Sequence, residues 1–339
     1  MRCGGTDETW RRWATGGTGG RRVGVETGLG AGRLADGSEM QLCVVEGPDT
    51  AWAPRITGLL GHKRPVYMGH IAAALDRPLG GLQTLFYIGC VGGDPISVAM
   101  VAGAHGAGLL GHVYTVPEWR QRRASTLVIA ALDADVRGRG YQVLTLGTNP
   151  AGHARRIYEA VGFRPVAPGS GSMCWFATAD ASTVPGGPLS VGPLRWDDWG
   201  WISAAAAAPP TGGEPLPRSR ILGVVGPGHV EAAFLAAMQA GVTLTVLRHG
   251  PAAVGWAALS ARDATALGGA WAIDFYVRPD CGADAGALLA SMAWPAGPVV
   301  CALPRQLGYR QEALRAAGFV PSAPIDALDG LILWVRGLG

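Results

Sequence analysis

Apolar positions follow two different periods along residues 40–177, and the changes of period predict the elements. Short apolar runs bounded by glycine-rich turns are typical of strands, and three successive runs of this kind form a meander. Apolar residues that recur about every three to four positions are typical of helices. The expected strands lie at 40–46, 82–89, 96–104, 107–116 and 141–147, with a return strand that starts at Phe163. The expected helices lie at 50–61, 70–76, 122–138 and 152–161.

The same order of elements recurs toward the C-terminus. A strand at 189–194 and a helix at 196–208 come first. Three strands, a helix, a strand, a helix and two closing strands are then expected at 242–249, 253–261, 270–277, 286–293, 298–304, 310–317, 318–324 and 330–336. The phrase IYEAVGFRPV of the first half is matched by ALRAAGFVPS in the second. We interpret the chain as an internal duplication.

Changes in composition place the domain boundaries. Residues 1–37 are rich in Gly, Thr and Arg and are expected to form an extended arm, because no strand–helix unit surrounds their glycine strings. Residues 38–180 form the first predicted domain, the Pro- and Gly-rich stretch 181–193 a linker, and residues 194–339 the second domain. The predicted fold class is α/β (α+β), with a mixed, mostly antiparallel sheet flanked by helices in each domain.

The composition fits two ordinary globular cores. The chain has 339 residues, of which 48% are hydrophobic and 16% charged. A net charge of +3 argues against a nucleic-acid partner. The six cysteines are scattered without a C-x-x-C pair, which favours free thiols in a reducing compartment over disulfides or zinc. No signal-peptide core and no apolar run of membrane-spanning length is found, so we expect a cytoplasmic protein without a membrane partner.

The chemistry that the sequence predicts is concentrated in residues 113–126, VYTVPEWRQRRAST. A strand ends here, a proline and several arginines follow, and a helix begins. Such a junction directs unpaired backbone N–H groups and the positive end of the helix dipole at one point. Anions bind at such a point, and Arg120, Arg122 and Arg123 can add charge-assisted hydrogen bonds to phosphate.

Two phrases of the first half resemble the pattern of the GNAT N-acetyltransferases. That pattern is VxPxxR-x-x-G-x-G/A, then a strand and an Asn, and then ARR-[LI]-Y-E-x-x-GF. Here the phrases read VPEWRQRRAS at 116–125, Thr148-Asn149, and ARRIYEAVGF at 154–163. The resemblance covers about residues 40–177. It implies two tandem GNAT domains, with acetyl-CoA as the acyl donor and no metal.

The resemblance also implies which residues hold the cofactor. The strand at 113–116 would pair with the pantetheine arm, and the loop amides would bind the pyrophosphate. The implied cofactor-binding residues are Tyr114, Thr115, Val116, Arg120, Gln121, Arg122, Arg123, Ala124, Ser125, Thr126, Asn149, Ala154 and Arg155. Arg123 and Ser125 stand where the family has glycines. Backbone amides do the binding, so we expect the Arg123 side chain to point outward or to reach a CoA phosphate.

Acyl transfer to an amine needs a proton acceptor and a proton donor for the leaving thiolate. Tyr158 matches the tyrosine that many family members place near the CoA sulfur; the alternative is that it only packs against the cofactor. His112, Tyr114 and Val116 should share one face of a strand, and histidine is the side-chain type suited to proton transfer at neutral pH. His112 is therefore the candidate base, and a water chain to Glu46 or Glu118 is the rival.

The second half lacks both features. Its loop reads VRPDCGADAGALL from Val277, with Asp280 and Asp284 in or beside the loop, and carboxylates repel a pyrophosphate. Leu314 stands at the tyrosine position. We therefore predict that this half has a GNAT-like fold without CoA chemistry, supporting the first half and forming a wall of the acceptor cleft.

The predicted function is transfer of an acetyl or other short acyl group from acyl-CoA to an amine of a small molecule. The two-domain plan is similar to that of mycothiol synthases, and it also fits secondary metabolism, as in GNAT proteins associated with clavulanic acid biosynthesis. The alternative is an acyl-CoA-binding accessory or sensor protein with little turnover. The expected partners are acyl-CoA and the amine acceptor, and the chain is expected to be a monomer or homodimer.

Overall fold

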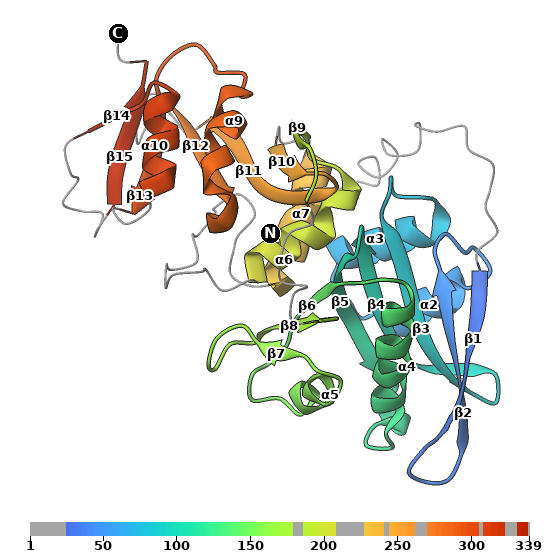
Figure 1. The fold of residues 1–339 in the computed structure, drawn as a ribbon. Coiled ribbons are helices and arrows are strands. Elements are labelled where there is room, and N and C mark those ends of the chain that lie inside the picture. Colours follow the sequence, from blue (N-terminus) through green and yellow to red (C-terminus); the bar gives the residue numbers. More distant parts are fainter. Residues whose placement is uncertain are drawn as a thin grey trace, which may run out of the picture.

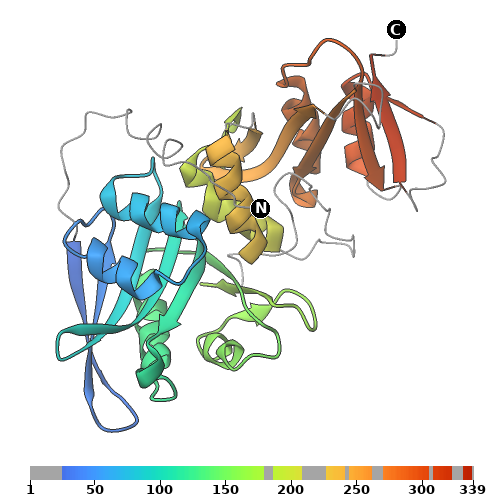
Figure 2. The ribbon, with the colours of Figure 1, turned by 180° about the vertical axis from the view of Figure 1, so that it is seen from behind.

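The computed structural model describes residues 25–178, 186–207, 227–240, 244–261, 270–304, 308–322 and 331–337. The fold is mixed α/β, with one mixed, mostly antiparallel sheet in each half and helices against both sheets (Figures 1 and 2). Within the described residues, no helix is both long and apolar enough to cross a membrane.

The first sheet contains eight strands in the order β1-β2-β3-β4-β5-β6-β8-β7. The strands are β1 (Val25–Arg33), β2 (Glu39–Glu46), β3 (Gln83–Val91), β4 (Asp94–Ala104), β5 (Ala107–Thr115), β6 (Val143–Gly147), β7 (Arg164–Pro165) and β8 (Ser172–Phe176). The β5–β6 pair is parallel and the other neighbours are antiparallel. A parallel pair needs a crossover, and helix α4 (Ala124–Gly138) supplies it.

Helices cover both faces of the first sheet because its strands are apolar on both sides. On β2, for example, Val44 belongs to the core under α4, whereas Val45 belongs to the core under α2 (Ala53–Leu60) and α3 (Pro65–Asp76). Figure 1 shows α4 in front of the sheet, and Figure 2 shows α2 and α3 on the opposite face. The short helix α5 (Ala154–Ala160) lies beside β6, β7 and β8.

The second sheet repeats the first from β2 onward. Its order, β9-β10-β11-β12-β13-β15-β14, again contains one parallel pair, β12–β13, at the corresponding place. The strands are β9 (Leu189–Pro193), β10 (Leu244–His249), β11 (Ala252–Ala261), β12 (Trp271–Val277), β13 (Val299–Pro304), β14 (Val320–Pro321) and β15 (Leu331–Arg336). The helices are α6 (Trp199–Ala207), α7 (Pro227–Ala240), α9 (Ala285–Ala290) and α10 (Gly308–Ala316).

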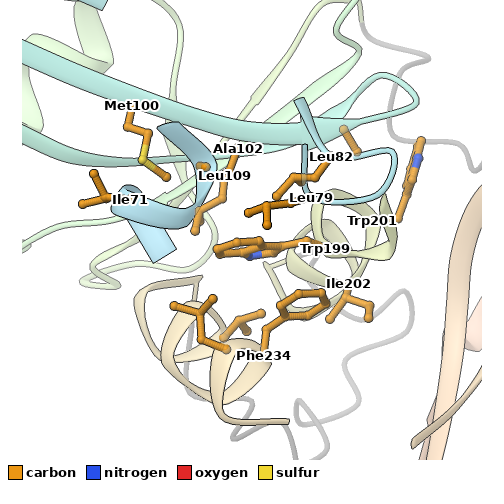
Figure 3. Packing of buried hydrophobic residues seen from close by; sticks show 14 of the residues in the cluster. Ile71, Leu79, Leu82, Met100, Ala102, Leu109, Trp199, Trp201, Ile202 and Phe234 are labelled. Atoms are coloured by element: carbon orange, nitrogen blue, oxygen red, sulfur yellow. The ribbon is translucent and has the colours of Figure 1, made fainter. Parts of the chain in front are cut away.

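Helices α6 and α7 join the two halves through one hydrophobic core. Trp199 and Phe234 stack with ring centroids 4.9 Å apart, and Trp199 lies between Phe234 and residues of strands β4 and β5 such as Ala102 and Leu109 (Figure 3). The backbone of α6 touches β5, because a Cβ at Gly200 would lie 2.0 Å from the carbonyl oxygen of Ala107. The core continues to Trp256 of the second sheet. In the Trp-rich segment 196–201, Trp199 and Trp201 are buried in this core.

Two elements differ from the sequence-based expectation. Residues 25–33 of the expected arm form β1, which pairs with β2 as a hairpin; the rest of the arm up to residue 24 lies outside the described residues. The strand expected at 189–194 is confirmed as β9, which overlaps the end of the expected linker and pairs with β10. Helix α7 was not expected, although Val230, Phe234 and Met238 recur at helical spacing and would have indicated it.

Candidate functional site

The site begins where β5 and β6 separate. Their parallel pairing covers Ala107 to Leu109 on β5 and ends there. Among the described residues, no strand therefore pairs with the remainder of β5, up to Thr115, on the side that faces β6. An unpaired strand edge offers alternating N–H and C=O groups to an extended ligand.

The loop after β5 presents a row of free amides. It consists of the 3-10 turn η2 (Pro117–Trp119) and residues 120–123, and α4 begins at Ala124. In residues 25–178, the amides from Gln121 to Thr126 make no hydrogen bond, and no side chain caps α4. These groups and the helix dipole favour an anion at this end of α4.

The strand edge, the loop and α5 enclose a pocket of about 430 Å³. From β5, the loop and the start of α4 come Tyr114, Thr115, Arg120, Gln121, Arg123, Ala124, Ser125 and Thr126, and from α5 come Ala154 and Tyr158. All of these were candidates from the sequence. Five more lining residues were not: Val113, Trp119, Ile129, His153 and Ile157. Their position beside the motif residues, on the same strand or helices, was the available signal.

Four of the cofactor-binding candidates do not line this pocket, because each makes a structural contact instead. The Val116 amide donates to the Ile96 carbonyl oxygen at 2.9 Å. Arg122 pairs with Asp36 at 2.6 Å, which ties the loop to the β1–β2 turn. Asn149 accepts the Ala151 amide at 3.0 Å and so shapes the turn before α5. Arg155 pairs with Glu159, four residues further along α5, at 2.7 Å.

The arginine side chains of the loop therefore differ in whether they already have a partner. Arg120 donates from Nε to the Thr115 carbonyl oxygen at 3.0 Å and lies over the Tyr114 ring. Arg122 is held by Asp36. Arg123 is exposed, lines the pocket and has no side-chain partner in the part of the chain that the structure describes. Arg123 is thus the loop cation that is available to a ligand.

The backbone explains why the Arg123 position suits glycine. Its φ is 71° and its ψ is 5°, in the left-handed region, and it forms the N-cap of α4. A residue with a Cβ is strained there by roughly 1 to 2 kcal/mol. The strain comes from the turn geometry, and the neighbouring Gln121 is also left-handed, with φ 60°.

We expect Arg123→Gly to raise the free energy of unfolding by about 0.5 to 1 kcal/mol, because relief of the left-handed strain exceeds the added entropy of the unfolded chain. Urea unfolding measures the change. The control is Arg122→Gly, whose φ is not positive and which removes the Asp36 ion pair, so it should destabilise. Equal destabilisation by both variants would contradict the expectation.

Tyr158 lies at the floor of the pocket. Burial raises the pKa of its hydroxyl to about 12, so the phenol keeps its proton at neutral pH. The side chain packs against Phe163, with ring centroids 6.1 Å apart. Among the described residues, the hydroxyl has no hydrogen-bond partner. Its oxygen is also not one of the side-chain atoms that are fully buried without a partner. It is therefore available to a group that enters the pocket.

His112 lies on a β-bulge, one strand position from the pocket. The β4–β5 register shifts between the pairs Val98–Tyr114 and Met100–Gly111, and the φ of His112 is 51°. The bulge interrupts the alternation expected for this strand. His112 faces α3, with its ring 5.3 Å from that of Tyr67, and Tyr114 lies on the same side.

The corresponding junction of the second half is closed and acidic. Arg278 pairs with Asp280 at 2.8 Å and holds the pKa of that carboxyl below its ordinary value, so Asp280 stays an anion. Asp284 pairs with His249. The Tyr309 hydroxyl donates to the Val277 carbonyl oxygen at 2.8 Å, where β12 ends. A larger cavity of about 760 Å³ beside β9 and β10 has no ionisable side chain in its lining.

No protein-family model matches the sequence, and no curated protein matches it. Solved structures match part of the chain. Ribosomal-protein-S18-alanine N-acetyltransferase from Escherichia coli is 15% identical, with a TM-score of 0.33 over 40% of this chain and 94% of its own. PaiA N-acetyltransferase from Thermoplasma acidophilum, in complex with coenzyme A, is 11% identical, with a TM-score of 0.31 over 39% of this chain and 98% of its own. The GNAT family N-acetyltransferase YhbS from Escherichia coli, also in complex with CoA, is 12% identical, with a TM-score of 0.33 over 49% of this chain and 88% of its own.

Proposed function

We propose that the chain is an acyl-CoA-dependent N-acyltransferase whose reaction takes place in the first half. One observation carries the proposal: an unpaired strand edge, a row of free amides with an available arginine, and a protonated tyrosine line the same pocket. A linear thioester that carries a pyrophosphate matches these groups: the pyrophosphate matches the amides and the arginine, the pantetheine arm the strand edge, and the thioester the tyrosine. The motifs that resemble the GNAT family lie on the same elements.

In the proposed complex, the amides from Gln121 to Thr126 bind the pyrophosphate, and Arg123 adds a charge-assisted bond to a phosphate oxygen. The pantetheine arm extends along the edge of β5 between Val113 and Thr115, as an added strand would. The thioester then lies where β5 and β6 separate, within reach of Tyr158. Arg122, Val116, Asn149 and Arg155 support the loop and the α5 turn without touching the cofactor.

The reaction needs the acceptor as a free amine. His112 takes one proton from the acceptor ammonium, and the amine nitrogen attacks the acyl carbon, so a C–N bond forms and the C–S bond breaks. Tyr158 donates its proton to the leaving thiolate and is restored by the proton that the new amide nitrogen loses. The net products are the amide, CoA with its thiol, and one proton that His112 releases to solvent.

The proposed acceptor is an amine of a small molecule, and a role in secondary metabolism remains a prediction. We propose that the acceptor approaches His112 from the side of the sheet that carries α3 and α7, opposite the face that carries α4. The second half, whose junction is acidic and filled by Tyr309, is proposed to form this wall and to bind no CoA.

Isothermal titration calorimetry should find one CoA bound per chain. Arg123→Glu should weaken binding at least about tenfold, because it reverses the available charge beside the pyrophosphate. Arg33→Glu is the matched control, since it makes the same charge change on an exposed side chain outside the pocket, and binding should stay the same. Two CoA molecules per chain, or equal losses in both variants, would contradict this assignment.

Turnover is tested with acetyl-CoA and a panel of amines, by following release of the CoA thiol. Acceptor-dependent release supports the transferase. Tight CoA binding without transfer to any amine favours an accessory or sensor protein instead.

A further inference from the structure

Helix α7 of the second half places a carboxylate directly on His112 of the first half. The Nε2 atom of His112 and the Oε1 atom of Glu231 are 2.7 Å apart. The two side chains are 5% and 8% exposed, respectively. The residues are 119 positions apart in the sequence, so only the packing of α7 against the first half brings them together.

The bulge on β5 makes this contact possible. In a regular strand His112 would point to the face opposite Leu109 and Gly111, because neighbouring side chains alternate and Leu109 faces the core under α2 and α3. The extra residue of the bulge turns the imidazole toward α7 instead. The carboxylate also lies beside Gly111, where a Cβ would be 3.8 Å from Oε2 of Glu231, an ordinary van der Waals distance.

Several other groups face the pair. From α3 come the Tyr67 ring, 5.3 Å from His112, and the buried His70, whose pKa is lowered by burial and also by His112. Lys63, before α3, is close enough to Glu231 for the carboxylate to act on its pKa, although burial dominates and lowers it. Tyr114, whose ring lies 4.3 Å from that of His62, is two residues further along β5. Among these groups, Glu231 is the one that hydrogen-bonds the imidazole.

The contact decides which nitrogen of His112 can accept a proton. A carboxylate accepts hydrogen bonds, so Nε2 carries the hydrogen and Nδ1 keeps its lone pair. Some side-chain nitrogen atoms in the described residues are fully buried and have no hydrogen-bond partner. They belong to His70, Trp175, Trp199, Arg310 and Trp334. Nδ1 of His112 is not among them and makes no hydrogen bond within the described residues, so it is not fully buried and its lone pair is free.

We propose that Glu231 is a positioning residue for His112: the second half supplies the carboxylate that orients and stabilises the imidazole that takes the acceptor's proton. This proposal rests on the acyl transfer proposed above. When Nδ1 takes the proton, the imidazolium faces a buried carboxylate, and the two charges stabilise each other. The second half is then part of the active site, and it does more than support the first half.

The kinetic test compares Glu231→Gln with wild type. The amide keeps the volume of the carboxylate but removes its charge, so kcat for acetyl transfer should fall about 10²-fold, within the range of general-base catalysis. His112→Gln should fall by a similar factor, and the double variant no further, because the two residues act as one unit. The Kd for CoA and the thermal unfolding midpoint should stay close to wild type.

A matched control exists in the second half. Asp284→Asn removes the carboxylate from the pair with His249, whose Nε2–Oδ2 distance is 2.9 Å, and should leave kcat unchanged. A second readout needs no turnover: ¹⁵N spectra of the imidazoles, assigned with His112→Gln, should show His112 as the Nε2–H tautomer in wild type. Glu231→Gln should reduce the population of that tautomer.

The outcomes separate this proposal from the acyltransferase itself. Wild-type turnover with an unchanged kcat in Glu231→Gln overturns the proposal alone, as does a His112 imidazole in the Nδ1–H tautomer. Losses that add in the double variant also overturn it, because they indicate independent structural effects. Absence of turnover in wild type with every amine overturns both proposals.

Discussion

Asp198→Ala should lower the free energy of unfolding by about 3 to 5 kcal/mol, because it leaves a buried guanidinium without its counter-charge. Arg248 donates from Nε and from its terminal Nη2 to the two carboxylate oxygens of Asp198, both at 2.6 Å. Asp198 is fully buried, and the Arg248 side chain is 4% exposed. The carboxylate also accepts the Arg195 amide at 2.7 Å, just before α6.

This pair holds the start of α6 against β10, so its loss should also weaken the contact between the halves. Chemical unfolding followed by tryptophan fluorescence measures the effect. An exposed pair provides the control: Asp133→Ala, which removes the partner of Arg137 on α4, should change stability by less than about 1 kcal/mol. The double variant Asp198→Leu/Arg248→Met removes both charges and should recover much of the loss. A loss as small as that of the control would contradict the expected burial effect.

His70 should make the protein lose stability as the pH falls. The side chain is buried against Trp196 and Trp199, and neither ring nitrogen has a partner among the described residues. Burial, with a smaller contribution from His112, lowers its pKa from 6.5 to about 3. Between these two values the unfolded chain binds the proton and the folded chain does not. The contribution of the neutral His70 side chain to the free energy of unfolding is therefore fully present above about pH 6.5, and it is lost progressively as the pH falls toward 3.

The contribution lost by about pH 4 is on the order of 3 kcal/mol. His70→Phe keeps an aromatic ring between the tryptophans and removes the titration. Urea unfolding at neutral pH and at about pH 4 should show a smaller pH dependence in the variant than in wild type. Other carboxyl groups titrate in both proteins, so the difference between the two isolates His70. Identical pH dependence would show that His70 does not titrate in this range.

Local patterns in the sequence predicted most of the fold. Strands such as β3, β4 and β5 follow from short apolar runs between glycine turns, and α4 follows from its apolar spacing. The parallel β5–β6 pair follows from the helix between them, since a crossover of that length permits it. Strand β1 was missed, because its glycines at positions 28, 30 and 32 hide any alternation and it is stable only through its pairing with β2.

Much of the candidate site could be predicted for the same reason. The loop residues and Tyr158 lie in short segments of the chain. The succession of strand, turn and helix in these segments is enough to place their side chains and amides. The local sequence could not predict which loop arginine forms an ion pair and which is available to a ligand. Asp36, from the distant β1–β2 turn, occupies Arg122, whereas the left-handed backbone at Arg123 leaves that side chain at the pocket.

The relation between the halves was decided by the tertiary structure alone. Repeated phrases indicate a duplication, but no periodicity in the chain says which helix of one half packs on which strand of the other. The bulge at His112 depends on pairing with β4, and the partner of His112, Glu231, lies on a helix from the second half. The neighbours of a side chain across such a contact depend on how two folded surfaces pack together. This packing cannot be predicted from the local sequence.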